Sequence, residues 1–375
     1  MFLHADSPEL GSWVMLHHLP QAGGRTRIEL LEAFGSIAAL FDASRAPLQH
    51  VLPDKPDTVA AILNGADAAR VEKVRAWLAQ EPTHHFVVWT DADYPPLLRE
   101  IPDPPIALYV LGNRAALTSP QLAIVGSRNP TPAGLANAQA FARALAAAGL
   151  TVTSGLALGI DGAAHRGALD GGGATIAVCG TGLDRVYPAR HRELAHAIVG
   201  NGALISEFAL GTSPLPHNFP IRNRLISGLA LGTLVVEAAL ESGSLITARL
   251  ALEQGREVFA IPGSIHAPQS RGCHALIRQG AKLVENANDV LEELGALAQF
   301  ARQHAPTSAT TTSALSVEAA RLLDHLGHDP ETLDALIERS GLTADVVSSM
   351  LGALELEGLV AAMPGGRFQR LPGGR

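Results

Sequence analysis

The stretch that decides the fold of this chain runs from Leu122 to Arg128 and reads LAIVGSR. Its uncharged residues end on a glycine, which is typical of a buried strand that stops abruptly. Ser127 and Arg128 therefore lie just beyond the carboxyl end of a strand, where a parallel sheet presents its ligand-binding edge. Thr131 and Pro132 follow as the cap and first residue of a helix. Helix amides, a hydroxyl and a guanidinium thus converge on one point, a geometry that suits a phosphate.

Outward from this stretch, strand and helix patterns alternate from residue 120 to 295. Strands are predicted at 122–125, 151–153, 175–179, 203–206, 233–236, 257–261 and 282–284, and helices at 133–148, 161–170, 190–199, 221–229, 245–254 and 273–279. Such alternation with apolar strands predicts an α/β fold, doubly wound, with a mainly parallel sheet.

The regions that flank the α/β pattern have different compositions. Residues 1–84 look helical, with short helices at 13–19 and 26–34 around a Pro/Gly turn. Such a pair resembles SAM-like or helix-hairpin-helix modules, whose turn amides bind DNA phosphates, although a small helical cap with its own core is an equally good interpretation. The prolines between residues 85 and 112 predict an extended connector without helix, and we place it in the domain 85–296.

The carboxyl-terminal part predicts a winged-helix domain over 314–375, after a linker over 297–313. Its expected helices cover 318–326, 330–340 and 343–357, and a two-stranded wing follows at 358–362 and 365–370. The domain carries 5 basic and 9 acidic residues, and the expected recognition helix has no Lys or Arg. We therefore expect a protein-contact or structural module. In the alternative, it is the main DNA-binding domain, and its removal would abolish binding.

Charge is unevenly distributed along the 375 residues, whose net charge is −8. Residues 120–290 carry 13 Arg/Lys and 11 Asp/Glu, a net of +2, whereas the remainder carries 15 and 25, a net of −10. Twelve of those 13 cations are arginine, whose planar fork suits bidentate phosphate contacts and base stacking. The net charge alone argues against nucleic acid, but its distribution favours an anionic ligand at the α/β region.

Cys179 and Cys273 are the only cysteines, and no metal-ligand spacing surrounds them. We expect no metal and no cofactor. No basic and then apolar leader opens the chain, and no run of about 18 apolar residues is present. We therefore expect a soluble cytoplasmic protein without membrane contact.

Several loops that follow the predicted strands bring glycine amides or arginines to one edge of the sheet. The candidate binding residues are Gly126, Ser127, Arg128, Ser154, Gly155, Gly180, Gly182, Phe219, Arg222, Asn223, Arg224, Ser242 and Gly243. Phe219 suits stacking on a base, with Arg222 or Arg224 on the adjoining phosphate, or else it fills the core. The glycine spacing is not that of a dinucleotide site, and a Walker lysine and a nucleophile elbow are absent. The pattern predicts a row of phosphates rather than bond-making chemistry.

Over residues 94–295 the chain resembles the DNA-processing protein A (DprA/Smf) family. The matching segments are YP at 94–95 with DPP at 103–105, AIVGSR at 123–128, SGLA at 154–157 with GID at 159–161 and AH at 164–165, GLD at 182–184 with YP at 187–188, FP at 219–220 with RNR at 222–224, and SGSLITA at 242–248. Several long motifs in one order make the resemblance specific.

The resemblance implies an extended Rossmann-like domain that binds single-stranded DNA and helps to load the recombinase RecA in natural transformation and homologous recombination. It implies a DNA-phosphate pocket at Gly126, Ser127 and Arg128, and a second DNA-contacting segment from Phe219 to Arg224. It also implies a homodimer through the region Ile265–Gln279. A protein of this kind is not an enzyme.

Two features leave room for other interpretations. Many members of the family carry lysine near Ala174 and near Pro216, where this chain has none, so its affinity is lower or Arg185, Arg190 and Arg192 compensate. Phosphoribohydrolases resemble this fold, and an enzyme of that class would use Glu237 or Asp184 as acid or base at the same edge.

Overall fold

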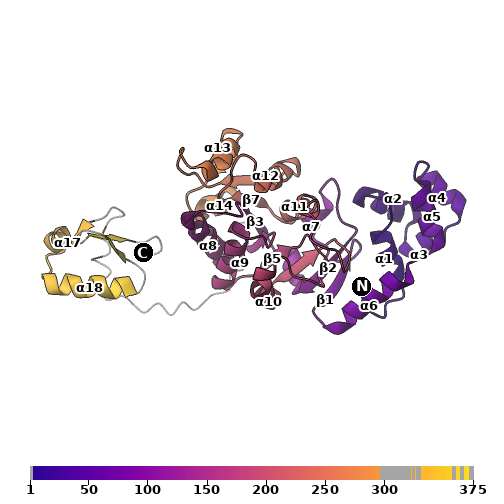
Figure 1. The fold of residues 1–375 in the computed structure, drawn as a ribbon, viewed down its shortest axis with the longest axis horizontal. Coiled ribbons are helices and arrows are strands. Elements are labelled where there is room, and N and C mark those ends of the chain that lie inside the picture. The colour runs from indigo at the N-terminus through magenta and orange to yellow at the C-terminus, as the bar shows by residue number, and fades with distance from the viewer. Residues whose placement is uncertain are drawn as a thin grey trace. The chain divides into compact units, whose positions relative to one another are not determined.

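The computed structural model describes residues 3–295, 322, 326, 331–356, 360–363 and 367–370. The chain divides into two compact units, Met1–Thr307 and Ser308–Arg375, and each is described by itself (Figure 1). Within the described residues, no helix is both long and apolar enough to cross a membrane.

A nine-stranded sheet forms the centre of the first unit, in the order β1-β2-β6-β5-β4-β3-β7-β8-β9. The strands are β1 (His84–Val88), β2 (Ala107–Gly112), β3 (Gln121–Val125), β4 (Thr151–Ser154), β5 (Thr175–Val178), β6 (Ala203–Ser206), β7 (Gly232–Val235), β8 (Glu257–Ala260) and β9 (Lys282–Leu283). β1 and β2 join the edge antiparallel, and all other pairs are parallel. The sheet grows in one direction from β3 to β6 and in the other from β7 to β9, so the connectivity reverses between β3 and β7.

Helices cover both faces of this sheet (Figure 1). One face carries α8 (Pro132–Ala147), α9 (Ile160–Asp170), α10 (Arg192–Asn201) and α14 (Ala287–Glu293); the other carries α7 (Pro96–Arg99), α11 (Asn218–Leu229), α12 (Gly243–Glu253) and α13 (Arg271–Arg278). Short 3₁₀ turns lie at Arg114–Thr118, Ala189–His191 and Pro268–Ser270. Successive residues of β3 face the two layers: Ile124 belongs to the buried cluster that contains Phe141 of α8, and Val125 belongs to the cluster that contains Leu225 of α11.

The doubly wound, mainly parallel α/β fold is therefore confirmed, with one difference at the connector. Residues 85–112 contain the strands β1 and β2 and the single-turn helix α7, where no helix was expected. Pro96 lies at the start of α7, where its missing N–H costs nothing and its fixed φ favours the helix. Proline is excluded only from the interior of a helix, so the prolines of the connector did not rule out a short helix that begins at one of them.

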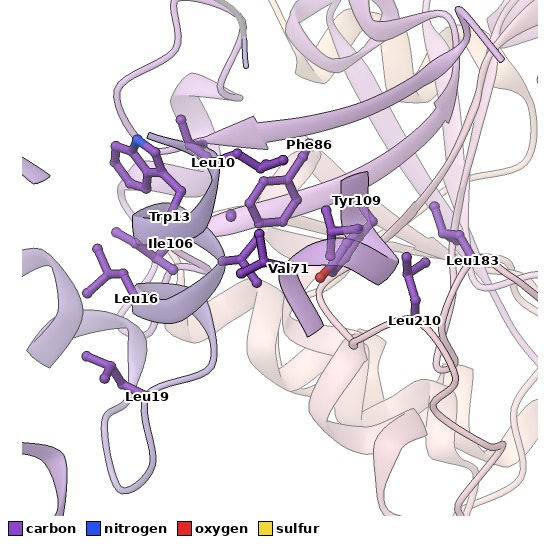
Figure 2. Close-up of a cluster of buried hydrophobic side chains, with 14 of the residues drawn as sticks. Leu10, Trp13, Leu16, Leu19, Val71, Phe86, Ile106, Tyr109, Leu183 and Leu210 are labelled. Atoms are coloured by element: carbon purple, nitrogen blue, oxygen red, sulfur yellow. The ribbon is translucent and has the colours of Figure 1, made fainter. Parts of the chain in front are cut away.

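The amino-terminal helices share their core with the sheet. They are α1 (Leu10–His17), α2 (Gly24–Phe34), α3 (Ile37–Phe41), α4 (Arg45–Val51), α5 (Pro56–Asn64) and α6 (Ala68–Gln80). Figure 2 shows Leu10, Trp13 and Leu16 of α1 beside Phe86 of β1 and Tyr109 of β2, all buried in one cluster. Because one apolar cluster spans both parts, the helices are held to the edge of the sheet by burial of apolar surface.

The Pro/Gly turn before α2 faces this sheet domain. The amide of Gly24 donates to Asp103 Oδ1 at 2.7 Å, and a Cβ on Gly24 would lie 1.8 Å from the carbonyl oxygen of Pro104. The amide that a helix-hairpin-helix turn would offer to a DNA phosphate is therefore bonded within the chain. This contact favours the helical-cap interpretation of residues 1–84.

Two neighbouring histidines of the helical cap lie at this junction. The Nε2 atom of His17 is 2.8 Å from the carbonyl oxygen of Glu207, and Nε2 of His18 is 3.2 Å from the Tyr109 hydroxyl. Burial lowers the pKa of His17 well below its ordinary value and lowers that of His18 to about 4, and the nearby charges of Arg27 and Arg70 act in the same direction. Both imidazoles are therefore neutral at pH 7.

Acid is expected to destabilise the first unit through these two histidines. Their folded-state pKa values lie below the unfolded value of about 6.5, so their contribution is complete above pH 6.5 and is lost as the pH falls toward 4. Replacing His18 by Gln keeps a hydrogen-bonding partner for Tyr109 and removes one titrating group. Thermal melts from pH 7.5 to 4.5 should show a shallower loss of Tm for H18Q than for the wild type, and parallel curves would contradict this assignment.

The second unit has the helices and wing that the sequence predicts. It contains α17 (Leu333–Ser340) and α18 (Ala344–Leu356), and a sheet of order β10-β12-β11 built from Glu331–Thr332, Arg367–Arg370 and Val360–Met363. Leu336, Val347, Leu351 and Val360 lie in its core. The linker 297–313 and, apart from Leu322 and Leu326, the expected helix 318–326 lie outside the described residues.

Candidate nucleic-acid interface

The candidate interface lies where the strand order reverses, at the carboxyl ends of β3 and β7. Val125 and Val235, the last residues of these strands, are paired in the parallel ladder. The loops that follow them, together with the amino-terminal ends of α11 and α12, enclose a cleft of about 420 Å³. Gly126–Asn129, Phe219–Asn223 and Glu241–Thr247 supply most of its walls. A doubly wound sheet binds its ligands at such a reversal point.

The loop after β3 is held by Glu237, which lies two residues beyond the end of β7. The amide of Ser127 donates to the carbonyl oxygen of Glu237 at 2.7 Å. The amide of Thr131 donates to Glu237 Oε2 at 2.9 Å, and the Thr131 hydroxyl donates to Oε1 at 2.5 Å. Thr131 also caps α8 by accepting from the amide of Gly134 at 3.0 Å. An internal carboxylate, rather than an external phosphate, therefore occupies the start of α8.

Arg128 is the exposed cation of this cleft. Its guanidinium carbon lies 5.7 Å from the centroid of the Phe219 ring, close enough for a cation–π interaction. Among the residues that the structure describes, Arg128 has no carboxylate within 4.0 Å of its guanidinium. Its hydrogen-bond donors are therefore available to a ligand.

Phe219 lies between this cleft and a second one of about 300 Å³. Its ring is partly exposed and lies 5.6 Å from the ring of Tyr187, with the two planes inclined by 37°. Tyr187 is 48% exposed and lines the second cleft with Leu158. A Cβ on Gly180 would lie 2.9 Å from the Phe219 ring, so glycine leaves the space that this ring occupies. Phe219 therefore forms a wall of the interface and does not fill the core.

Arg222 follows Phe219 by less than one helical turn but lies inside the protein. It is 3% exposed, and its Nη1 atom donates to the carbonyl oxygen of Gly155, at 2.6 Å, and to that of Val178. Burial lowers its pKa and raises the pKa of the neighbouring Asp161, and each charge favours the ionised form of the other. Arg222 thus joins the ends of β4 and β5 beneath the clefts.

Other predicted residues are also bonded within the chain. Ser154 is fully buried and donates to the carbonyl oxygen of Ile124 at 2.6 Å. Gly180 accepts from the side-chain amide of Asn218 at 3.0 Å, and the amide of Gly182 donates to Thr212 at 3.2 Å. These buried residues therefore hold the loops in place and do not form their outer surface.

Arg224 has acidic partners on the side of the helical cap. Its guanidinium donates to both carboxylate oxygens of Glu207, at 2.9 and 2.6 Å, and lies 3.4 Å from Asp103. The two carboxylates raise the pKa of Arg224 against the effect of burial. Its guanidinium therefore secures the junction with the helical cap.

Apart from Arg224, which is half-buried and paired with Glu207, the predicted residues separate into two groups. Those that are at least partly exposed along the edge are Gly126, Ser127, Arg128, Phe219, Asn223, Ser242 and Gly243. Those that are buried beneath it are Ser154, Gly155, Gly180, Gly182 and Arg222. Ser242 caps α12, whose open start lines the first cleft, and a Cβ on Gly243 would meet no atom within 4 Å.

Two further residues line the clefts although the sequence pattern did not single them out as candidates. Asn129 lines both clefts, and Tyr187 lines the second. Tyr187 was detectable as the aromatic residue of a glycine-containing loop that follows a strand. Nothing in the spacing distinguishes Asn129 from an ordinary turn residue.

A doubly wound sheet with an aromatic residue and an exposed arginine at its reversal point is typical of proteins that bind nucleotides or nucleic acids, and winged-helix units are common among the latter. Residues 85–295 match the family model of DNA recombination-mediator protein A, and residues 306–366 match the DprA winged helix domain. The chain belongs to the DprA/Smf family.

Individual relatives agree with this assignment. The chain is 46% identical to Protein Smf of Escherichia coli over 303 residues, which are 79% of this chain and 80% of the relative. The X-ray structure of DNA processing protein A from Streptococcus pneumoniae superposes with a TM-score of 0.66 at 38% identity, covering 75% of this chain and 95% of that one. DNA processing protein A from Helicobacter pylori, described for its single-stranded DNA binding mode, gives 0.51 at 31% identity, with 56% and 95% covered.

Proposed function

We propose that this protein binds single-stranded DNA along the edge formed by Gly126–Arg128, Phe219, Asn223 and Ser242–Gly243. The observation that carries the proposal is the pair of adjoining clefts that share Arg128 and Phe219. Arg128, which has no carboxylate partner among the described residues, offers its guanidinium to a phosphate. Phe219 and Tyr187 offer aromatic faces to bases. The Helicobacter pylori relative, described for its single-stranded DNA binding mode, supports the same ligand.

A binding role fits the two carboxylates of the edge better than phosphoribohydrolase chemistry does. Glu237 accepts two hydrogen bonds from Thr131, and Asp184 accepts from the amide of Gly211 at 2.7 Å. Lys73 and Arg185 also lie within 4.0 Å of Asp184. Carboxylates that hold loops in place are poorly suited to exchange protons with a substrate. We therefore propose that the protein is not an enzyme.

Family membership supports the wider role. We propose that the bound strand is protected and handed to the recombinase RecA in natural transformation and homologous recombination, in the cytoplasm. We also propose a homodimer through Ile265–Gln279, where Ile265 is 74% exposed and α13 adjoins it.

The missing lysines near Ala174 and Pro216 are compensated, in this proposal, by arginines beyond the second cleft. Arg190, in the 3₁₀ turn before α10, and Arg192, the first residue of α10, are exposed and have no ion pair among the described residues. Arg185 is partly engaged by Ser213 and Asp184. We propose that Arg190 and Arg192 attract the strand where it leaves Tyr187.

Fluorescence anisotropy with labelled oligo-dT tests the DNA-binding proposal. We expect affinity to rise with oligonucleotide length, to fall steeply with salt, and to exceed that for a duplex of equal length by at least about tenfold. Equal affinity for duplex and single strand would contradict the proposed ligand. Release of a base or a ribose phosphate from a panel of mononucleotides would favour the enzyme instead.

A further inference from the structure

The start of α8 is a site that the chain itself fills. The first amides of a helix lack partners within the helix and attract anions, and in doubly wound folds the helix after the first parallel strand commonly binds a phosphate there. Here the Glu237 carboxylate lies at that end of α8, where its oxygens accept from the amide and the hydroxyl of the cap residue Thr131, and that hydroxyl in turn accepts from the Gly134 amide. α8 extends over 16 residues, so its aligned peptide dipoles favour an anion at this end.

The surrounding backbone is shaped around this carboxylate. A Cβ on Gly134 would lie 2.4 Å from Glu237 Cδ and 2.6 Å from each carboxylate oxygen. A Cβ on Gly126 would lie 2.9 Å from the carbonyl oxygen of Glu237. Glycine at both positions therefore gives the Glu237 residue the room that it occupies, and the contact is part of the packing of the loop.

We propose that Glu237 is a specificity-determining residue that acts as a built-in substitute for phosphate. Its carboxylate excludes free phosphate and nucleoside monophosphates from the start of α8 by occupancy and by charge repulsion. It also fixes the loop from Gly126 to Thr131, so that Ser127 and Arg128 lie at the open cleft. In combination with the proposed DNA binding, on which this role rests, the device favours a continuous strand over a single nucleotide.

Glu253 on α12 provides a matched control. It is exposed and lines neither cleft, and its removal changes the net charge by the same amount as removal of Glu237. Among the hydrogen bonds and ion pairs of the described residues, it makes no contact with Thr131 or the start of α8. A difference between the two variants therefore reports on the filled site and not on overall charge.

The test measures Tm of the full chain in chloride buffer and in inorganic phosphate or sodium formate at equal ionic strength. E237A empties the site, so we expect its Tm in chloride to be lower than that of the wild type. Either anion should raise the Tm of E237A by about 2–4 °C more than it raises the Tm of the wild type. E253A should respond as the wild type does. T131A loses the cap but keeps the carboxylate in place, so it should be destabilised without recovery by anions. An E237A response equal to that of E253A would overturn the proposal.

A second variant decides the matter if E237A does not fold. E237Q keeps the size of the side chain and an acceptor for Thr131 while it removes the charge. We expect thymidine monophosphate to compete with labelled oligo-dT at least about tenfold more effectively in E237Q than in E253Q, because the repulsion at the start of α8 is gone. Equal competition in both variants would refute the role of Glu237. The phosphate and formate measurements need no DNA, so failure of the proposed DNA binding remains distinguishable from failure of this inference.

Discussion

Replacing Arg128 by alanine is expected to weaken oligo-dT binding by about 10- to 100-fold, a loss typical of a residue that both pairs with phosphate and stacks on an aromatic ring. The Arg128 guanidinium is exposed, has no carboxylate partner among the described residues, and lies 5.7 Å from the Phe219 ring centroid. Because it makes no buried contact, Tm should change by no more than about 1 °C.

Two further variants make this measurement specific. R128K keeps the charge but loses the planar fork, so it should recover only part of the affinity. R143A removes an exposed arginine from α8, away from the clefts, and should bind as the wild type does. Anisotropy titrations with oligo-dT at two salt concentrations separate the variants, and R128A should also show a smaller salt dependence. An affinity of R128A equal to that of R143A would contradict the proposed phosphate contact.

The sequence was sufficient for the fold because the signals were local and repeated. β3 and β5 are short, mostly apolar runs followed by glycine or cysteine, and the helix after β3 begins at a recognisable Thr-Pro cap, so strand and helix periods alternate clearly. The connector was harder to predict, because β1 pairs with β2, and β2 in turn pairs with β6, which lies about 90 residues further along the chain.

The sequence predicted which loops meet at the edge of the sheet, but it did not predict the burial of each side chain. Arg128 and Arg222 are the same residue type at the same edge. Only the tertiary structure shows that Arg128 is exposed, whereas Arg222 is buried with 3% of its surface exposed. Glu237 was likewise considered only as a candidate acid or base, because its bond to Thr131 joins residues 106 positions apart. Sequence patterns report which loops reach the edge, whereas packing decides which of their side chains remain free.

Replacing Arg222 by alanine is expected to lower the free energy of unfolding by about 3 kcal/mol, which corresponds to a fall in Tm of about 6–10 °C. The change removes a buried cation that donates to the carbonyl oxygens of Gly155 and Val178. It also leaves the buried Asp161 carboxyl without the charge that offsets its burial, which raises its pKa further. Calorimetry of the full chain measures the effect on the first unit.

The control for this variant is R249A, which removes an exposed arginine from α12 and should leave Tm unchanged. The decisive comparison is with R128A. If Arg222 holds β4 and β5 together, R222A loses stability first, and oligo-dT binding falls only because Phe219 and the loop after β4 are displaced. If R222A instead melts as the wild type does but binds oligo-dT as poorly as R128A, its guanidinium reaches the strand directly. The buried position of Arg222 would then belong to the unbound protein alone, and DNA would have to draw the side chain out of its carbonyl contacts.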